Sequence, residues 1–397
     1  MKVPTNTRDT VEEFWNESIL INCLKEGRKT APNDFSVAIA KYLDVSSGKV
    51  FLTRSAGVAL EKILLNISDN KKDTVLISSF NCTVIADAIL KADLKVDTFD
   101  LADQRGRIDW EQVASLLTVR HAAVVIPHLF GVPTDFRPIL EPARKLGIWV
   151  IEDCAHALGS KIDGKMVGTL GDAALFSFNY DKPLSLGGGG ALVIPTGSGL
   201  CNNLNLKQDI GSFDVDQKEL INFQKFLKIR RSEIGKYLNF SSRVVRFVYR
   251  RLINVKKNPP IISAGIGPIR TALGIWQLKQ YQHVIMKRNF NAAIFDKNEY
   301  CLSWHVDNNV EPNWLKQKVI VPNIKKVNHI SKELQKKGLR VGVFNWGKTI
   351  DSYIGRNERP NAKYMAQHGL DIPIHQNMLP EQCAEIRDLI CSDSIKI

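Results

Sequence analysis

GIWVIEDCAHALGSKIDGKMVGTLGDAALFSFNYDKPLSLGGGGALVIP, residues 147–195, is the stretch that decides the fold. One apolar run ends in Glu152 and Asp153, and a second ends at Ser177, five residues before Lys182. Short runs rich in apolar and β-branched residues, bounded by polar and glycine segments, predict strands of a buried sheet. The residues that carry chemistry are therefore expected at the ends of strands.

Lys182 and Asp153 suit a site for pyridoxal phosphate (PLP). A lysine forms a Schiff base with this cofactor when it is partly desolvated and held in place. A strand-end aspartate pairs with the pyridinium nitrogen, which makes the ring an electron sink. The alternative is a surface lysine together with an aspartate that caps a helix.

Two patterns resemble the sugar-nucleotide aminotransferases of the DegT/StrS type, which are PLP enzymes of fold type I. Residues 152–156, EDCAH, resemble the strand-end acidic pair followed by two small residues and Gln or His. Residues 177–182, SFNYDK, resemble the family's SF-x-x-x-K pattern. The resemblance spans most of residues 35–200 and returns weakly near 263–280 and 370–390. It implies an α/β fold with a large domain, built on a mostly parallel sheet flanked by helices, and a smaller α+β domain.

The resemblance also implies roles for single residues. Asp153 would hold the ring nitrogen, and His156 would reach the phenolic oxygen of the cofactor. Ser177 would bind the phosphate, and Lys182 would be both the Schiff-base lysine and the proton shuttle. His128, in a turn that resembles the family's H-L-x-G-x-x-x-D, is either a ligand of substrate or cofactor or a packed loop residue.

Residues 51–65, FLTRSAGVALEKILL, predict a strand, a small-residue turn and a helix. Small residues at the start of a helix let backbone N–H groups approach an anion, so Ser55, Ala56 and Gly57 form a candidate phosphate cup. Gly57 stands where the family often has a threonine. Cys82 stands where the family often has an aromatic residue that stacks on the cofactor ring, so Cys82 or a neighbour is expected to cover that ring.

The composition fits two domains or one large α/β domain, since the chain has 397 residues of which 44% are hydrophobic. Its seven cysteines form no CxxC pair, which favours reduced thiols in a cytoplasm. The N-terminus lacks an apolar signal core, and no run approaches 18 apolar residues. A soluble cytoplasmic protein, or at most a membrane-peripheral one, is expected.

The net charge of +13 is concentrated in residues 217–257. Twelve Lys or Arg face only Glu219 and Glu233 there, a balance of +10. Apolar residues spaced by three and four predict helices in an insert over about 201–258. Its basic face meets anionic lipid, or it is a packed helical insert with a solvated face or a dimer contact. Nucleic acid is not expected, because no reader motif accompanies the charge.

Pro259 and Pro260 predict a boundary between a large domain, 1–258, and a small one, 259–397. By the resemblance, Ser263 and Gly265 replace an asparagine and an arginine of a segment that reaches across a dimer. Strands are expected at 319–322 and 339–343, and helices at 8–25, 35–43, 329–337 and 380–391. Candidates for substrate contact are Arg340, Asn345, Trp346 and His375.

The sequence thus predicts a homodimeric PLP-dependent aminotransferase. By the resemblance it moves an amino group, in the family usually from glutamate, to a keto-sugar nucleotide in surface polysaccharide or amino-sugar biosynthesis. No metal is expected. Two alternatives stay open: a PLP-dependent sugar dehydratase, against which Lys182 argues because relatives of that kind typically carry histidine there, and a non-catalytic regulator or membrane-associated assembly factor.

Overall fold

The computed structural model describes residue 15 and residues 17–31, 33–46, 49–69, 71–202, 206–231, 265–295, 302–336, 342–343 and 347–391. Its α-helices are α1 (Glu17–Gly27), α2 (Asp34–Leu43), α3 (Ala56–Ile67), α4 (Thr83–Lys91), α5 (Trp110–Ser115), α6 (Arg137–Lys145), α7 (Phe213–Arg231), α10 (Pro268–Ala293), α11 (Ile324–Lys336), α12 (Ile350–Tyr353), α13 (Pro360–His368) and α14 (Pro380–Cys391). Short 3₁₀ turns are η3 (Leu129–Gly131) and η4 (Gly199–Asn202).

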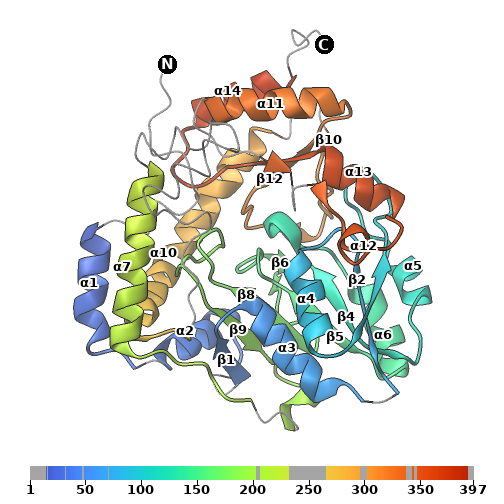
Figure 1. The fold of residues 1–397 in the computed structure, drawn as a ribbon, viewed down its shortest axis with the longest axis horizontal. Helices are drawn as coiled ribbons and strands as arrows, with labels where there is room; N and C mark the ends of the chain where they lie inside the picture. The colour runs from blue at the N-terminus through green and yellow to red at the C-terminus, as the bar shows by residue number, and fades with distance from the viewer. Residues whose placement is uncertain are drawn as a thin grey trace.

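The central sheet has seven strands in the order β1-β9-β8-β5-β4-β2-β3. They are β1 (Val50–Thr53), β2 (Thr74–Ser78), β3 (Lys95–Phe99), β4 (His121–Pro127), β5 (Trp149–Asp153), β8 (Ala173–Ser177) and β9 (Gly190–Val193). Strand β9 pairs antiparallel with both β1 and β8, whereas β8, β5, β4, β2 and β3 pair in parallel. The prediction of a mostly parallel sheet flanked by helices is confirmed (Figure 1).

The apolar runs are continuous because helices cover both faces of the sheet. Successive residues of β5 enter different cores: Val150 packs in one cluster with α2 and α10, and Ile151 in another with α3 and α4. Strand β8 alternates in the same way, with Phe176 and Leu175 on opposite faces. Side chains alternate across a strand, so a sheet buried on both faces needs apolar residues at every position.

A second sheet, antiparallel throughout, has the order β10-β12-β14-β13. Its strands are β10 (Leu302–Ser303), β12 (Gln317–Ile320), β13 (Gly342–Val343) and β14 (Gly369–Ile372). Their core, under α11, α13 and α14, also includes Phe80, Leu129 and Phe130 from loops after the central strands. A three-stranded sheet joins β11 (Val310–Glu311), β6 (Lys161–Ile162) and β7 (Lys165–Met166). The division of the chain at 258/259 falls outside the described residues and stays a prediction.

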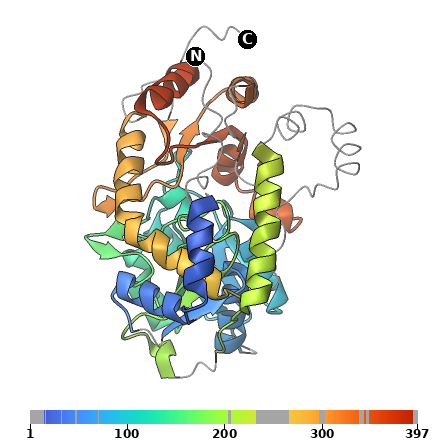
Figure 2. The same cartoon turned by 90° about the vertical axis from the view of Figure 1, so that its left-hand side faces the viewer.

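Helix α10 runs from one core to the other (Figures 1 and 2). It contributes Ile269 and Tyr281 to the core under the central sheet, and its C-terminal end contributes Ala292 to the smaller core. Helices α1, α2 and α7 pack against it.

The insert is helical from Phe213 rather than from about 201, because residues 206–212 form no helix. Leu220 and Phe223 of α7 are buried, with the Phe223 ring 4.5 Å from that of Trp15. These apolar residues therefore pack in the core and do not face lipid. Residues 232–264, with most of the basic stretch, lie outside the described part. None of the described helices is both long and apolar enough to cross a bilayer.

Candidate active site

Lys182 and His156 meet at the carboxyl end of the central sheet. Nζ of Lys182 lies 2.7 Å from Nε2 of His156, and both residues are partly buried. Burial, followed by the charge of Lys182, lowers the pKa of His156 well below 6.5, so the imidazole is neutral. The sequence placed these two side chains in one site, and the structure brings them into direct contact.

The backbone of Phe130 sets the tautomer of His156. The Phe130 N–H donates to Nδ1 of His156 at 3.1 Å, so the hydrogen of the neutral ring is assigned to Nε2. That N–H points at Nζ of Lys182, the nitrogen that would bond to an aldehyde. Phe130 has a φ of +60°, which is uncommon for a residue other than glycine.

Asp153 ends β5 and is 6% exposed. Its Oδ1 accepts a hydrogen bond from the Ala155 N–H at 3.1 Å. Burial raises the pKa of Asp153, while the Ala155 N–H and the charge of Lys182 act against burial. A cationic group beside Asp153 would favour its ionised form, which is the arrangement that a pyridinium nitrogen requires.

The loop that carries Lys182 is fixed at its base and from behind. The Phe178 N–H donates to the Gly189 carbonyl at 3.0 Å, which closes the loop. Gln277 of α10 holds Ser185 through two hydrogen bonds of 2.8 Å, one to its N–H and one to its carbonyl. A lysine on a loop tied down in this way approaches its target with little freedom.

Ser55, Ala56 and Gly57 form the start of α3. The Ser55 hydroxyl caps the helix by accepting from the Val58 N–H at 3.2 Å. The first N–H groups of a helix have no acceptor within it, so those of Ala56 and Gly57 are suited to an anion. Ser177 pairs with Gly190 across β8 and β9, and a Cβ on Gly190 would lie 2.5 Å from the Ala56 nitrogen. The glycine thus brings the Ser177 strand end against the predicted phosphate cup.

The model of the DegT/DnrJ/EryC1/StrS aminotransferase family matches residues 10–207. The chain belongs to this family. It is 26% identical over 385 residues to UDP-4-amino-4,6-dideoxy-N-acetyl-β-L-altrosamine transaminase of Campylobacter jejuni, covering 93% of the chain and 90% of the relative. It is 25% identical over 348 residues to an uncharacterized protein of Methanocaldococcus jannaschii, covering 84% and 82%.

A putative sugar aminotransferase of Streptococcus pneumoniae, solved in its PLP form, shares the fold. The two structures have a TM-score of 0.72, with 98% of each chain covered, at 17% identity. The predictions of the family, of its fold and of a PLP-dependent aminotransferase are confirmed.

The side chains of this aminotransferase fit PLP. A carboxylate ends a strand for the ring nitrogen, an imidazole N–H is available for the phenolic oxygen, and an amine lies beside it for the aldehyde. The predicted phosphate cup at Ser55, Ala56 and Gly57 is open only because residue 190 is a glycine and has no Cβ. Individual cofactor contacts nevertheless stay predictions.

Gly57, where the family often has threonine, packs closely against α4. A Cβ on Gly57 would lie 2.8 Å from Cγ1 of Val84. Val84 therefore occupies the space that a threonine side chain at position 57 would need. Gly265 is more constrained, because its Cβ would lie 1.7 Å from the Asp209 carbonyl oxygen. Ser263 lies outside the described residues.

Cys82 is a better candidate than its neighbour Phe80 for the residue that covers the cofactor ring. It is the N-cap residue of α4 and lies in the electrostatic field of Lys182 and Asp153, although burial is the largest influence and raises its pKa. Phe80 points elsewhere: its ring lies 5.8 Å from that of Trp304 and 5.6 Å from Nζ of Lys318.

His128 is a packed residue. Its Nε2 lies 3.1 Å from Oε2 of Glu152, and both side chains are fully buried. Glu152 also accepts three backbone N–H groups, from Gly168, Leu170 and Gly171, each at 2.8 Å. His128, Glu152 and Cys154 lie as close together as the ligands of a metal ion do. Because the carboxylate of Glu152 already accepts these hydrogen bonds, a structural role is favoured for the three residues.

Sequence reasoning missed Asn313, which joins the site to the second sheet. Its Nδ2 donates to the carbonyls of His156 and Leu158 at 2.9 and 2.8 Å, and lies 3.2 Å from the hydroxyl of Tyr281. Asn313 is 157 positions from His156 in the chain, and no local pattern signals such a contact.

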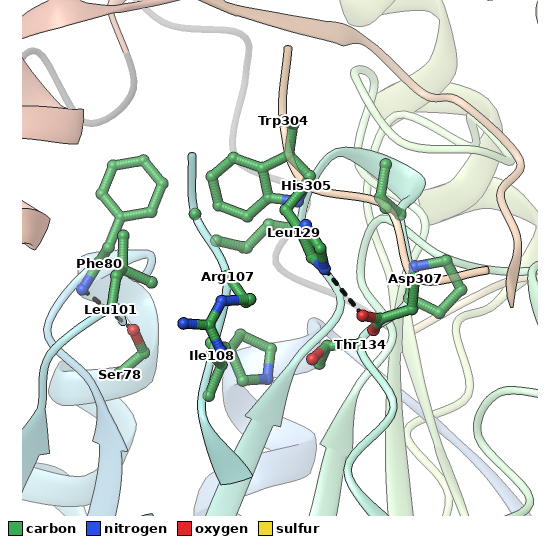
Figure 3. A pocket seen from close by; sticks show the side chains of 14 residues that line it. Ser78, Phe80, Leu101, Arg107, Ile108, Leu129, Thr134, Trp304, His305 and Asp307 are labelled. Atoms are coloured by element: carbon green, nitrogen blue, oxygen red, sulfur yellow. Dashed lines mark hydrogen bonds and ion pairs between the residues drawn. The ribbon is translucent and has the colours of Figure 1, made fainter. Parts of the chain in front are cut away.

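A separate pocket opens at the carboxyl ends of β2 and β4 (Figure 3). Arg107, Thr134, His305 and Asp307 are among its lining residues, and His305 Nε2 lies 2.9 Å from Asp307 Oδ1. None of the predicted cofactor residues lines it. Among the other candidates His375 is buried, and Arg340, Asn345 and Trp346 lie outside the described residues.

Proposed function

We propose that the protein transfers an amino group from glutamate to a keto-sugar nucleotide, with PLP held by the residues at the carboxyl end of the sheet. The observation that carries this proposal is the 2.7 Å contact between Nζ of Lys182 and Nε2 of His156, on a loop pinned from behind by Gln277. The related transaminase of Campylobacter jejuni, named for an amino-sugar nucleotide, supports the substrate class.

Each residue has a task that follows from its position. Asp153 holds the ring nitrogen in its protonated form, and the bound cofactor supplies an electron sink. His156 donates Nε2–H to the phenolic oxygen. Lys182 would hold the cofactor through its aldehyde until the donor amine displaces Nζ, and the freed amine would then carry the proton of the donor α-carbon. Ser55, Ser177 and the N–H groups of Ala56 and Gly57 hold the phosphate.

The proposed enzyme works as a homodimer in the cytoplasm. Five cysteines, Cys23, Cys82, Cys154, Cys383 and Cys391, are free thiols, which supports a reducing compartment. The family resemblance supports the dimer, which size-exclusion chromatography with light scattering would test. Contact of the basic segment with anionic membranes stays a prediction, since that segment lies mostly outside the described part.

The visible spectrum of the purified protein with PLP tests the proposal. Wild type should show a band near ~420 nm that moves to ~330 nm with glutamate. Lys182→Ala should lack the band. Lys161→Ala should keep it, because Lys161 is not a predicted cofactor residue and its Nζ pairs with Oε2 of Glu311 at 2.9 Å. Borohydride reduction followed by peptide mass analysis should place the cofactor on Lys182. Identical spectra for wild type and Lys182→Ala would overturn the assignment and favour the non-catalytic alternative.

A further inference from the structure

Ser185, on the loop that carries Lys182, uses all of its polar groups to hold that loop. Its N–H donates to Oε1 of Gln277, and its carbonyl accepts from Nε2 of Gln277, each at 2.8 Å. Its hydroxyl contacts the Tyr180 carbonyl at 3.1 Å and Nε1 of Trp15 at 2.9 Å. These two contacts of the hydroxyl have no part yet in the proposed reaction.

The chemistry of the two partners fixes the direction of both bonds. The indole N–H of Trp15 can only donate, and a carbonyl oxygen can only accept. Oγ of Ser185 therefore accepts from Trp15 and turns its single hydrogen to the Tyr180 carbonyl. A hydroxyl that accepts a hydrogen bond is polarised and donates more strongly. Because the bond between Ser185 and Tyr180 spans Lys182, the indole tightens the segment that carries this lysine.

Trp15 is itself held by the helix that leads into the basic segment. The residue is 3% exposed, and its ring lies 4.5 Å from that of Phe223 of α7. Phe223 is fully buried, and its ring lies 6.3 Å from that of Tyr180. Helix α7 runs beside α1, which begins just after Trp15 (Figures 1 and 2). The indole therefore contacts both α7 and the loop of Lys182.

We infer that Trp15 is a positioning residue for Lys182: by donating to Ser185 it keeps the loop closed between residues 180 and 185, and so holds Nζ of Lys182 in place. The inference rests on the proposed function, in which this nitrogen bonds to the cofactor. A group held in one place reacts faster than one that must first find its geometry. Because Ser185 is fully buried, bulk water does not replace a partner that its hydroxyl loses.

The test compares two tryptophans that make the same kind of hydrogen bond. Trp15→Phe removes the indole N–H and keeps an aromatic ring. Trp110→Phe is the matched control, because Trp110 is 4% exposed and its Nε1 donates to Oγ1 of Thr134 at 2.8 Å. Thr134 is not a predicted cofactor residue. Both variants lose the same side-chain volume and the same donor, but only the first affects the loop of Lys182.

Two measurements report on the loop rather than on the stability of the whole fold. In the cofactor-free protein, hydrogen exchange of the Ser185 amide should be about 3- to 10-fold faster in Trp15→Phe than in wild type. After PLP is mixed with the protein, the visible band should grow about 3- to 10-fold more slowly. Trp110→Phe should match wild type in both measurements.

Ser185→Ala tests whether Trp15 acts through the hydroxyl. This change removes the acceptor of the indole N–H, so Trp15→Phe/Ser185→Ala should form the band no more slowly than Ser185→Ala alone. If Trp15→Phe slowed the band by the same factor with and without the hydroxyl, Trp15 would act by packing alone, and the inference would be overturned.

Wild-type exchange and a wild-type rate in Trp15→Phe would overturn the inference and leave the proposed function intact. Equal slowing in Trp110→Phe would also overturn it, since the effect would then be a general loss of stability. If Trp15→Phe does not fold, Ser185→Ala decides: slower growth of the band supports closure of the loop, and the wild-type rate overturns it. A wild-type protein without any visible band would overturn the proposed function, and the inference with it.

Discussion

The backbone N–H of Phe130 donates to Nδ1 of His156 at 3.1 Å, and this single contact decides which ring nitrogen carries the hydrogen. The side chain is thereby set as a donor at Nε2, towards Lys182. Burial, which lowers the pKa of His156, keeps the ring neutral.

His156→Leu should slow the glutamate half-reaction by about 10- to 100-fold, the range expected for loss of a hydrogen bond to a charged oxygen. His156→Gln should recover most of the rate, because its amide offers an N–H from a similar position. Single-turnover absorbance measures both. A glutamine variant as slow as the leucine variant would show that the ring does more than donate one hydrogen bond.

Asp153→Asn should stabilise the cofactor-free protein while it reduces the rate of transamination. The folded-state pKa of Asp153 lies above 3.8, so the fold disfavours the ionised form. Wild type therefore loses stability relative to the variant as pH rises through 3.8, and the full difference is present above the folded-state pKa.

Thermal melts of the cofactor-free proteins at pH 7 and at pH 3.5 measure this difference. A rise of about 1–3 °C is expected for Asp153→Asn at pH 7, and a smaller one at pH 3.5. Asp172→Asn is the control for the rate: burial also raises the pKa of Asp172, whose carboxylate accepts from the Val150 N–H, so this variant should gain stability as well but keep the rate of transamination. Equal melting temperatures for wild type and Asp153→Asn at pH 7 would contradict the expected cost of the buried charge.

Gly57→Thr should destabilise the protein by about 1–3 kcal/mol, because its Cβ would lie 2.8 Å from Cγ1 of Val84. The double variant Gly57→Thr/Val84→Ala should recover stability and bind PLP more tightly than Val84→Ala alone, through the added hydroxyl. Urea unfolding and cofactor titration of all four proteins complete the cycle. Strictly additive free energies would show that Val84 is not what excludes threonine.

Asn313→Ala should cost about 2–3 kcal/mol of the free energy of unfolding, because the His156 carbonyl loses its donor and the Leu158 carbonyl keeps only the Tyr281 hydroxyl. It should also lower the single-turnover rate, since the backbone of His156 loses its support. Asn309→Ala, whose Nδ2 contacts the partly exposed Asp135 at 2.8 Å, should cost less than about 1 kcal/mol. Similar losses in the two variants would argue against a special role for Asn313.

The candidate cofactor residues could be proposed from the sequence because they fall in local patterns. A strand end, a helix start and a lysine five residues after a strand are each visible in a short window of sequence. Asn313 and Trp15 could not be, because their contacts join segments more than 150 positions apart. Phe130 was missed because a positive φ in a residue other than glycine has no sequence signal.

Most element boundaries followed from apolar periodicity, and the exceptions have physical causes. Helix α11 begins at Ile324 rather than at 329, because the side chain of Asn323 accepts from the Lys325 N–H at 2.9 Å and starts the helix early. Helix α14 has the predicted bounds. The apolar residues Leu220 and Phe223 gave a sound helix prediction but no indication of their partner, since periodicity does not distinguish a protein core from a lipid surface.

Helix α10 belongs to two hydrophobic cores, with Ile269 and Tyr281 in one and Ala292 in the other. If either core unfolds, the part of α10 that packs in it becomes exposed to solvent. Unfolding of the two cores is therefore thermodynamically coupled through α10, and a calorimetric scan should record the described parts of the enzyme as one cooperative transition. The candidate active site would unfold in the same transition, because Gln277 of α10 holds the loop that carries Lys182.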